Sequence, residues 1–138
     1  NLYEFADLTT PTVSVVIGEG GSGGALAISV ADKLAMMRYS VYAVISPEGC
    51  SAILWNDPAK VETAANALRI TAENLKDLKL IDDVINEPLI GAHRQREEAV
   101  EALRDYFLNS LVELKKLTPE QRAEKKYKKI MALGSFEA

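Results

Sequence analysis

The chain has 138 residues, of which 48% are hydrophobic, so it can bury the core of one domain and is not a disordered polymer. Its formal net charge of −4 at pH 7 argues against a nucleic-acid-binding protein with a broad basic face. A single cysteine, Cys50, excludes an internal disulfide framework and fits a reducing, cytoplasmic location.

The sequence has no membrane signal. No apolar run approaches the roughly 20 residues that a transmembrane helix needs, so we expect no contact with a membrane. The chain begins at Asn1 without a methionine, and a predicted buried strand follows shortly after. We therefore expect it to be a fragment of a longer subunit.

The first third of the chain predicts two strands with a helix between them. Residues 1–8 carry apolar side chains at the spacing of a helix end, and residues 11–17 form a β-branched run typical of a buried strand. From residue 25 onward the chain is rich in Ala, Leu and Met, which favour helices, so we expect a helix that continues to about Met37. Residues 40–45 predict the second strand.

The next stretch predicts short helices and a final strand. Ser46 and Pro47 are favoured residues at the N-cap and at the first position of a helix. Apolar residues at helical spacing predict further helices over residues 60–70 and after Thr71. Residues 81–85 predict a short strand.

The remainder of the chain predicts two helices. Residues 94–116 place apolar side chains three and four positions apart, which indicates an amphipathic helix. Thr118, Pro119 and Gln121 predict a capping box at the start of the last helix. The lysines of this last helix are expected on a solvated face: Lys125, Lys126, Lys128 and Lys129.

Glycine dominates the junction between the first strand and the first long helix. Five of the seven residues 18–24 are glycine. Glycine allows positive φ and removes the Cβ atoms that would hold a ligand away from the backbone. The first N–H groups of a helix have no intrahelical partner and lie at the positive end of its dipole. We therefore expect a site for negative charge, either a permanent phosphate or an oxyanion that forms only in a transition state.

A bound nucleotide fits this stretch poorly. Gly18, Gly20 and Gly23 satisfy G-x-G-x-x-G, the dinucleotide-binding fingerprint. However, the second predicted strand ends without the carboxylate that should hold the ribose, and Glu48 lies just beyond it. No Walker lysine follows the glycines. A transient oxyanion is therefore the leading interpretation, and a nucleotide is a distant alternative.

Other kinds of chemistry have weak support in the sequence. His93 is the only histidine, and no G-x-S-x-G nucleophile elbow occurs, so a serine triad is not indicated. Cys50 lies in an apolar segment, which favours a core residue over a nucleophile. No cluster of Cys and His indicates a metal site on this chain.

Six motifs follow one another along the chain: GEGGSGGALAI (18–28), YAVISPEGC (42–50), ILW (53–55), LKDLKLID (75–82), EPLIGAHR (87–94) and KYKKIM (126–131). In order and spacing they resemble the α-subunit family of bacterial acetyl-CoA carboxylase carboxyltransferase, a part of the crotonase-like superfamily. The resemblance runs along nearly the whole chain and covers the C-terminal part of that subunit. It implies an α/β fold, with a crotonase-like spiral of ββα units over residues 1–90 and a helical C-terminal extension over residues 91–138.

The resemblance also implies a reaction and its partners. Family members transfer a carboxyl group from carboxybiotin, held on biotin carboxyl carrier protein, to acetyl-CoA, giving malonyl-CoA for fatty acid synthesis. The resemblance implies a zinc-containing β subunit that provides most of the CoA side, an α2β2 heterotetramer and a cytoplasmic enzyme. The chain taken alone is expected to be inactive.

The same resemblance assigns roles to two glycines. Gly20 and Gly21 are expected to be catalytic, with backbone N–H groups that donate to the ureido oxygen of biotin while the carboxyl group leaves. Two fixed donors would stabilise the negative charge that grows on that oxygen.

Four further residues are expected beside the substrate: Ser22, Gly23, Gly24 and Glu48. Gly23 and Gly24 would also let their helix approach a neighbouring element closely. For Glu48 a second interpretation stays open, in which it caps the helix that follows the second strand.

Two other functions stay open. The chain could be a non-catalytic assembly module, since half of the family's fold is absent from it and its last helices are long. It could also be a different CoA-dependent enzyme of the crotonase family, which the biotin dependence of turnover would distinguish.

Overall fold

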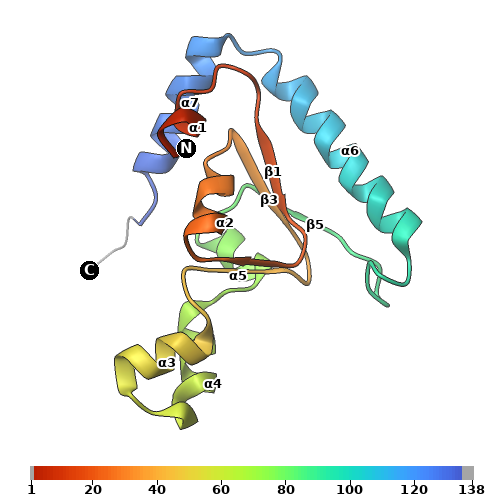
Figure 1. The fold of residues 1–138 in the computed structure, drawn as a ribbon. Helices are drawn as coiled ribbons and strands as arrows, with labels where there is room; N and C mark the ends of the chain where they lie inside the picture. Colours follow the sequence, from red (N-terminus) through yellow and green to blue (C-terminus); the bar gives the residue numbers. More distant parts are fainter. Residues whose placement is uncertain (1, 135–138) are drawn as a thin grey trace.

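Figure 1 shows a computed structural model of the chain, which describes residues 2–134. The first part contains α1 (Leu2–Ala6), β1 (Val13–Val16), β2 (Glu19–Gly21), α2 (Ser22–Ser29), β3 (Lys33–Met37), β4 (Val41–Ala43) and α3 (Pro47–Trp55). The second part contains the 3₁₀ helix η1 (Pro58–Lys60), α4 (Val61–Leu68), α5 (Ala72–Asp77), β5 (Asp83–Ile85), α6 (Arg96–Leu114) and α7 (Pro119–Met131).

Two parallel sheets arise from two successive ββα units. β1 and β2 lead into α2, and β3 and β4 lead into α3. β1 pairs with β3, with Val13 opposite Lys33, while β2 pairs with β4, with Glu19 opposite Val41. β5 extends the first sheet in the order β1–β3–β5. Each unit therefore adds one strand to each sheet, as a ββα spiral requires, although the sequence shows no repeat of residues.

The prediction of a helix that reaches Met37 is wrong. α2 ends at Ser29, and Lys33–Met37 forms β3, the central strand of the three-stranded sheet. Residues 34–37 are all buried. A strand that is buried on both faces shows no polar alternation, so its sequence resembles that of a buried helix. Packing in the sheet here overrides the helix propensity of Ala, Leu and Met.

The glycine-rich stretch contains a strand, although its composition is typical of a loop. Glu19–Gly21 forms β2 and pairs in parallel with β4. Glycine has low strand propensity, so the partner strand and not the local sequence determines this conformation. The helix that follows begins at Ser22, directly after the strand.

The hydrophobic core joins the two sheets to α5. Its buried side chains come from β3 and from the segment around α5: Leu34, Met36, Ala72, Leu75 and Ile81. Three partly buried side chains of the neighbouring strands pack against them: Val16, Tyr42 and Val84. This cluster fixes the sheets relative to each other and so positions the carboxyl ends of β2 and β4.

Two long helices complete the fold. α6 contacts β1 and β5, and Figure 1 shows α7 beside α1. α7 begins with the predicted capping box, because Gln121 N–H donates to Thr118 Oγ1 at 3.3 Å and Thr118 N–H donates to Gln121 Oε1 at 2.9 Å. No helix within residues 2–134 combines the length and apolarity needed to cross a membrane.

The prediction that the lysines of α7 lie on a solvated face holds only in part. Lys125 and Lys128 are exposed. Lys126, however, is 3% exposed and donates from Nζ to the Phe5 carbonyl oxygen at 3.2 Å. The acceptor is supplied by the far end of the chain, so no local pattern in the sequence indicates the burial of this lysine.

Lys129 joins three segments that are distant in sequence. Its Nζ donates to the carbonyl oxygens of Ala31 and Asp32 at 3.1 and 3.0 Å and to Asp82 Oδ2 at 3.1 Å. Asp82 Oδ2 also accepts the N–H of Leu34 at 2.7 Å. α7 is thereby tied to the start of β3 and to the segment before β5.

The segment from α3 to α4 forms a helical arm that projects from the sheets (Figure 1). α3 packs mainly against η1 and α4. Ser46 caps α3 as predicted, since its Oγ accepts the N–H of Gly49 at 3.1 Å. The arm leaves the body next to the carboxyl end of β4, so its first turn lies beside the glycine-rich segment.

Candidate functional site

A cavity of about 500 Å³ opens at the carboxyl ends of β2 and β4. Parallel sheets commonly bind their ligands at this end of the strands. The residues that line the cavity are Glu19, Gly20, Gly21, Ser22, Val41, Ala43, Ile45, Ser46, Pro47, Glu48 and Ile70. We call it the glycine cavity. Four predicted site residues meet there, namely Gly20, Gly21, Ser22 and Glu48.

The pairing of β2 with β4 separates the two predicted catalytic glycines. Val41 N–H donates to the Gly18 carbonyl oxygen at 2.9 Å, and Gly20 lies opposite Tyr42. Backbone groups of successive strand residues point to opposite sides, so this register directs the N–H of Gly20 toward β4 and that of Gly21 away from it. β2 is an edge strand, and within the described part of the chain no strand pairs with Gly21 on that side.

The two glycines also differ in the space around them. A Cβ atom added at Gly20 would lie 3.1 Å from both Tyr42 Cδ2 and Val16 Cγ1, which is tighter than ordinary contact. A Cβ atom added at Gly21 would meet no atom within 4 Å. A side chain at position 20 would therefore force Tyr42 and Val16 to shift by a few tenths of an ångström, whereas the Cβ position of Gly21 is open at the cavity wall.

Ser22 begins α2 in a strained conformation. Its φ of 56° lies in the left-handed region, which costs a residue with a Cβ atom about 1–2 kcal/mol. Gly21 before it occupies the N-cap position and supplies no side-chain acceptor for the first turn. The first N–H groups of α2 are thus left without a side-chain cap, beside the glycine cavity.

Two helix N-termini meet the glycine cavity. α2 begins at Ser22 on one side, and α3 begins at Pro47 on another. The cap of α3 is the side chain of Ser46, so the alternative capping role of Glu48 is not needed. The positive ends of both helix dipoles favour negative charge in the cavity.

The charges that line the cavity favour a transient anion over a permanent one. Glu19 and Glu48 both line it, and among the described residues no Lys or Arg does. Two carboxylates repel a bound phosphate, which weakens the nucleotide alternative. Backbone N–H groups, in contrast, can stabilise an oxyanion that exists only during a reaction.

The prediction that Gly23 and Gly24 let α2 approach a neighbouring element is wrong. A Cβ atom added at either residue would meet no atom within 4 Å. Among the residues of α2, all of them described, Ala25 alone is buried, so the helix turns a different side to the sheets. Neither glycine lines the glycine cavity.

A second cavity, of about 490 Å³, lies next to the first. It is lined by Ser22, Gly23, Leu26, Tyr42, Ala43, Val44, Leu68, Ile70, Leu75 and Leu80. None of these residues is charged, and we call it the apolar cavity. The sequence did not indicate it, because its wall combines residues 22–26, 42–44 and 68–80. The sequence signal that bears on this cavity was the hydrophobic spacing, which predicted the individual helices and strands of its wall but not how they come together.

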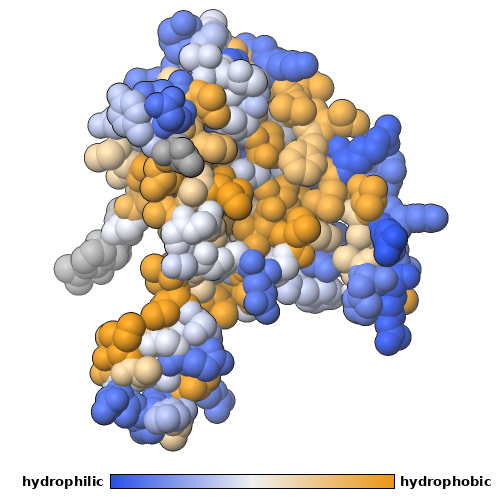
Figure 2. All heavy atoms as spheres, viewed as in Figure 1, coloured by the Kyte–Doolittle hydropathy of each residue, from blue (hydrophilic) through white to orange (hydrophobic). Residues whose placement is uncertain are grey.

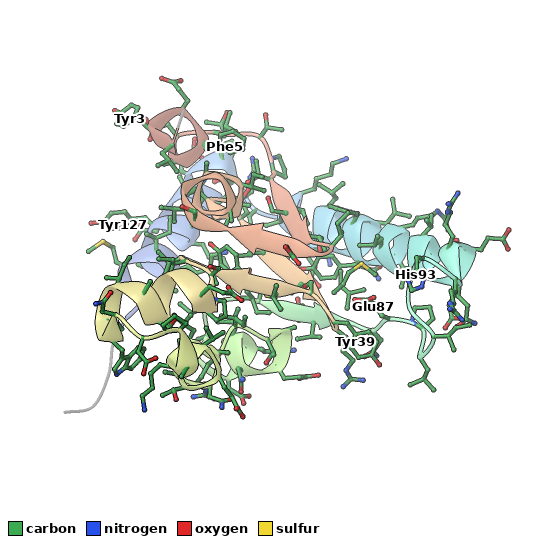
Figure 3. The ribbon with its side chains drawn as sticks, turned by 60° about the horizontal axis from the view of Figure 1, so that its bottom comes forward. Tyr3, Phe5, Tyr39, Glu87, His93 and Tyr127 are labelled. Carbon is green, nitrogen blue, oxygen red and sulfur yellow. The ribbon has the colours of Figure 1, made fainter. Side chains whose placement is uncertain are left out.

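The other candidates for chemistry lie apart from both cavities. Cys50 is buried in α3, in agreement with its interpretation as a core residue. The ring of His93 lies against Gly91, near the start of α6 (Figure 3). Across residues 2–134, no group of three or more His, Cys, Asp or Glu side chains is arranged to hold a metal ion.

With the fold and the cavities defined, the sequence can be compared with known families. Residues 1–134 match the family described as acetyl co-enzyme A carboxylase carboxyltransferase-like. The chain belongs to this family. The resemblance inferred from the six sequence motifs is thereby confirmed.

Curated relatives carry the name acetyl-coenzyme A carboxylase carboxyl transferase subunit alpha. The relative from Aliarcobacter butzleri is 84% identical over 136 residues, and the one from a Nitratiruptor species is 65% identical over 136 residues. Each alignment covers 99% of this chain and 44% of the relative. The chain therefore spans less than half the length of these relatives.

Solved structures of transcarboxylase 12S have a similar fold. One, with hydrolysed methylmalonyl-coenzyme A bound, has a TM-score of 0.55 and 27% identity, and the match covers 78% of this chain and 20% of that chain. Another, with methylmalonyl-coenzyme A and methylmalonic acid bound, has a TM-score of 0.55, 24% identity and coverage of 78% and 22%. The predicted crotonase-like α/β fold is confirmed, and the domain division at residue 90 stays a prediction.

Proposed function

We propose that the chain supplies part of the active site of a biotin-dependent acetyl-CoA carboxyltransferase. In the proposed reaction a carboxyl group passes from carboxybiotin to acetyl-CoA, giving malonyl-CoA for fatty acid biosynthesis. Membership of the family supports the class of reaction, and the names of the curated relatives support acetyl-CoA as a substrate. The observation that carries the proposal is Gly21, whose N–H points away from β4 at the open wall of the glycine cavity.

The backbone of Gly21 is proposed to stabilise the developing anion. Carboxybiotin would supply the carboxyl group in an activated form. When that group leaves, the N–H of Gly21 donates to the ureido oxygen on which negative charge grows. Loss of one such donor typically costs about 3 kcal/mol of transition-state stabilisation. The N–H of Gly20 as a second donor rests on the family resemblance, since the strand register directs it toward β4.

The remaining site residues divide by position. Ser22 and Glu48 are proposed to contact the substrate, because both line the glycine cavity. Gly23 is proposed to lie beside the substrate at the apolar cavity, which it lines. Gly24 lines neither of these cavities, so its proposed role rests on the family resemblance alone.

The proposed partners follow from the subunit names. The relatives are named alpha subunits, which supports a second kind of subunit in the enzyme. We propose a zinc-containing β subunit that forms most of the CoA side, an α2β2 heterotetramer, and biotin carboxyl carrier protein as the carboxyl donor. A cytoplasmic location is proposed from the family resemblance and the single cysteine.

Malonyl-CoA formation tests the proposal. The complete natural polypeptide and its partner subunit are mixed with acetyl-CoA and carrier protein that bears radiolabelled carboxybiotin. We expect labelled malonyl-CoA when every component is present and none when the carrier is left out. An intact assembly that forms no labelled malonyl-CoA would overturn the proposal. Turnover of acyl-CoA that does not require biotin would instead indicate another CoA-dependent enzyme of this fold.

A further inference from the structure

α2 begins directly after Gly21 and has little apolar anchorage. It contacts mainly β2, the strand that leads into it, and of its eight residues, all of them described, only Ala25 is buried. Most helices in proteins are held by an apolar face that packs on the core, and one small side chain provides little of that support. Other contacts must therefore fix the direction of this helix at the glycine cavity.

Hydroxyl groups hold the carboxyl end of α2. Ser14 Oγ, from β1, donates to the Ile28 carbonyl oxygen at 2.7 Å. Ser29 Oγ, in the last turn of α2, donates to the Leu26 carbonyl oxygen at 2.9 Å. The carbonyl groups of a final helical turn have no intrahelical partner, so the two hydroxyl groups satisfy acceptors that the helix itself leaves open.

Tyr42 completes this arrangement from β4. Its Oη lies 2.8 Å from Ser29 Oγ. A serine hydroxyl group has one proton, and Ser29 gives that proton to the carbonyl oxygen of Leu26, so the phenol of Tyr42 is the donor of the bond between the two side chains. A relay of two hydrogen bonds therefore runs from Tyr42 through Ser29 to the backbone of α2.

The body of the fold holds Tyr42 in place. The side chain is partly buried against the hydrophobic core, and its backbone N–H donates to the Ile70 carbonyl oxygen at 3.0 Å. In the pairing of β2 with β4, Tyr42 lies opposite Gly20, and its ring limits the space at that glycine. One residue therefore constrains both ends of the segment: its ring lies beside β2, and its hydroxyl group holds the last turn of α2.

We propose that Tyr42 is a positioning residue for carboxyl transfer, which aims the N–H groups at Gly21 and in the first turn of α2 through its hydrogen bond to Ser29. This inference rests on the proposed function and extends it. Eight residues of α-helix span about 12 Å, so a tilt of about 5° at the last turn moves the first turn by about 1 Å. A misplacement of about 1 Å can lower a rate about 100-fold.

Tyr42→Phe tests the inference, because it removes the hydroxyl group and keeps the ring beside Gly20. The complete polypeptide is assembled with its partner subunit, the complex is isolated by size-exclusion chromatography, and malonyl-CoA formation is followed at increasing concentrations of carboxylated carrier protein. We expect kcat to fall about tenfold, because the donors are aimed less well at the developing anion. The KM for the carrier should stay within about twofold, since the weakened interaction is made only in the transition state.

Tyr39→Phe is the matched control. It makes the same chemical change at a residue that is 57% exposed and lines neither the glycine cavity nor the apolar cavity. Both kcat and KM should stay within about twofold of the natural values.

Ser29→Ala breaks the same relay at its second hydroxyl group. We expect a similar loss of kcat, and Ser29→Thr, which keeps a hydroxyl group, should restore most of it. In the double variant of Tyr42→Phe and Ser29→Ala the losses should not multiply, because both residues act through one chain of hydrogen bonds. Ser29 lies outside the hydrophobic core, so this variant gives a result even if Tyr42→Phe does not assemble.

Three results would overturn the inference. Tyr42→Phe or Ser29→Ala, isolated as an intact complex, could keep kcat within about twofold of the natural value. The KM for the carrier could rise while kcat stays unchanged, which would show direct contact between Tyr42 and the substrate. The losses of the two single variants could also multiply, which would show that they act separately. In all three cases carboxyl transfer by the natural protein would still stand. If the natural protein transfers no carboxyl group at all, the proposed function fails and the inference fails with it.

Discussion

Ser22 has a strained backbone conformation and lines both cavities. Asn56 and Arg69 share its left-handed conformation, with φ of 50° each, but they occupy the C-caps of α3 and α4. A left-handed residue is common at that end of a helix, because it ends the helix and satisfies its last carbonyl groups. Ser22 stands at the start of a helix instead, where the same conformation has no such benefit. Strained residues cluster at functional sites, so this conformation supports the role proposed for the segment.

Ser22→Gly is expected to raise the free energy of unfolding by about 0.5–1 kcal/mol. Glycine adopts positive φ without a Cβ clash, and this relief outweighs its greater freedom in the unfolded chain. Urea unfolding of both forms measures the change. Ser22→Ala is the control, because it keeps the Cβ atom and the strain. An equal gain from the alanine variant would show that the strain is not the cause.

At the scale of elements, α7 shows how a partly buried cation holds distant segments together. Lys129 donates to two backbone carbonyl groups and to the Asp82 carboxylate, and its side chain is 28% exposed. Lys128, its neighbour, pairs with Glu124, and their side chains are 72% and 64% exposed. The two lysines are neighbours in the sequence, but they differ strongly in the number of hydrogen-bond acceptors that each one satisfies.

Lys129→Ala is expected to lower the free energy of unfolding by about 2 kcal/mol, because it leaves partly buried acceptors without their donor. Lys128→Ala should change it by less than about 0.5 kcal/mol, since an exposed ion pair contributes little. Denaturant unfolding of the two variants checks this difference. Similar losses in both would contradict the structural role assigned to Lys129.

The contact between α6 and β5 predicts a response to alkaline pH. Burial raises the pKa of the Tyr106 phenol above its usual 10, and the charges of Asp83 and Asp82 raise it further, against a hydrogen bond with Ser110 that lowers it. Above about pH 10 the unfolded chain releases this proton while the folded chain keeps it. The stabilisation that Tyr106 provides is therefore present below pH 10 and is lost as the pH rises beyond it.

Tyr106→Phe removes the titrating group from this contact. Unfolding free energies at about pH 9 and pH 11 should fall less in this variant than in the natural protein. Chemical denaturation at the two pH values measures both slopes. If the two proteins lose the same stability over this range, the fold does not depend on the protonation of Tyr106.

Local sequence patterns correctly predicted the starts of α3 and α7. They failed for features that depend on partners distant in the sequence. Ser46 and Thr118 act through residues three positions ahead, so both caps were visible in the sequence. β3 was mistaken for a helix because its strand conformation depends on pairing with β1 and β5, neither of which adjoins it in the sequence. The burial of Lys126 depends on an acceptor at Phe5. The glycines located the candidate site in the sequence. The direction of each N–H and the apolar cavity were not predictable, because both depend on residues that are distant in the sequence.

At the scale of the whole molecule, apolar surface gathers near the candidate site. Figure 2 shows hydrophobic residues over the sheets between α2 and α6 and on the helical arm. Ile17, Val44 and Ile53 are exposed by 68%, 75% and 73%. Exposed apolar surface on this scale is typical of sites that a ligand or further polypeptide covers. It fits a chain that spans less than half the length of its curated relatives.

The central claim is that the open backbone of Gly21 stabilises the developing anion. Its most direct test is the rate of malonyl-CoA formation by Gly21→Ala in the assembled enzyme, with Gly18→Ala as the matched control. A Cβ atom at either position meets no atom within 4 Å, so neither variant should disturb the fold. At Gly21, which lines the cavity, a methyl group would displace the reacting oxygen.

We expect Gly21→Ala to lower kcat about 100-fold, since a displacement of about 1 Å can cost that much. Gly18→Ala, which lies outside the glycine cavity, should stay within about twofold of the natural rate. A Gly21→Ala enzyme that forms malonyl-CoA at the natural rate, or one that loses no more activity than Gly18→Ala, would contradict the assignment.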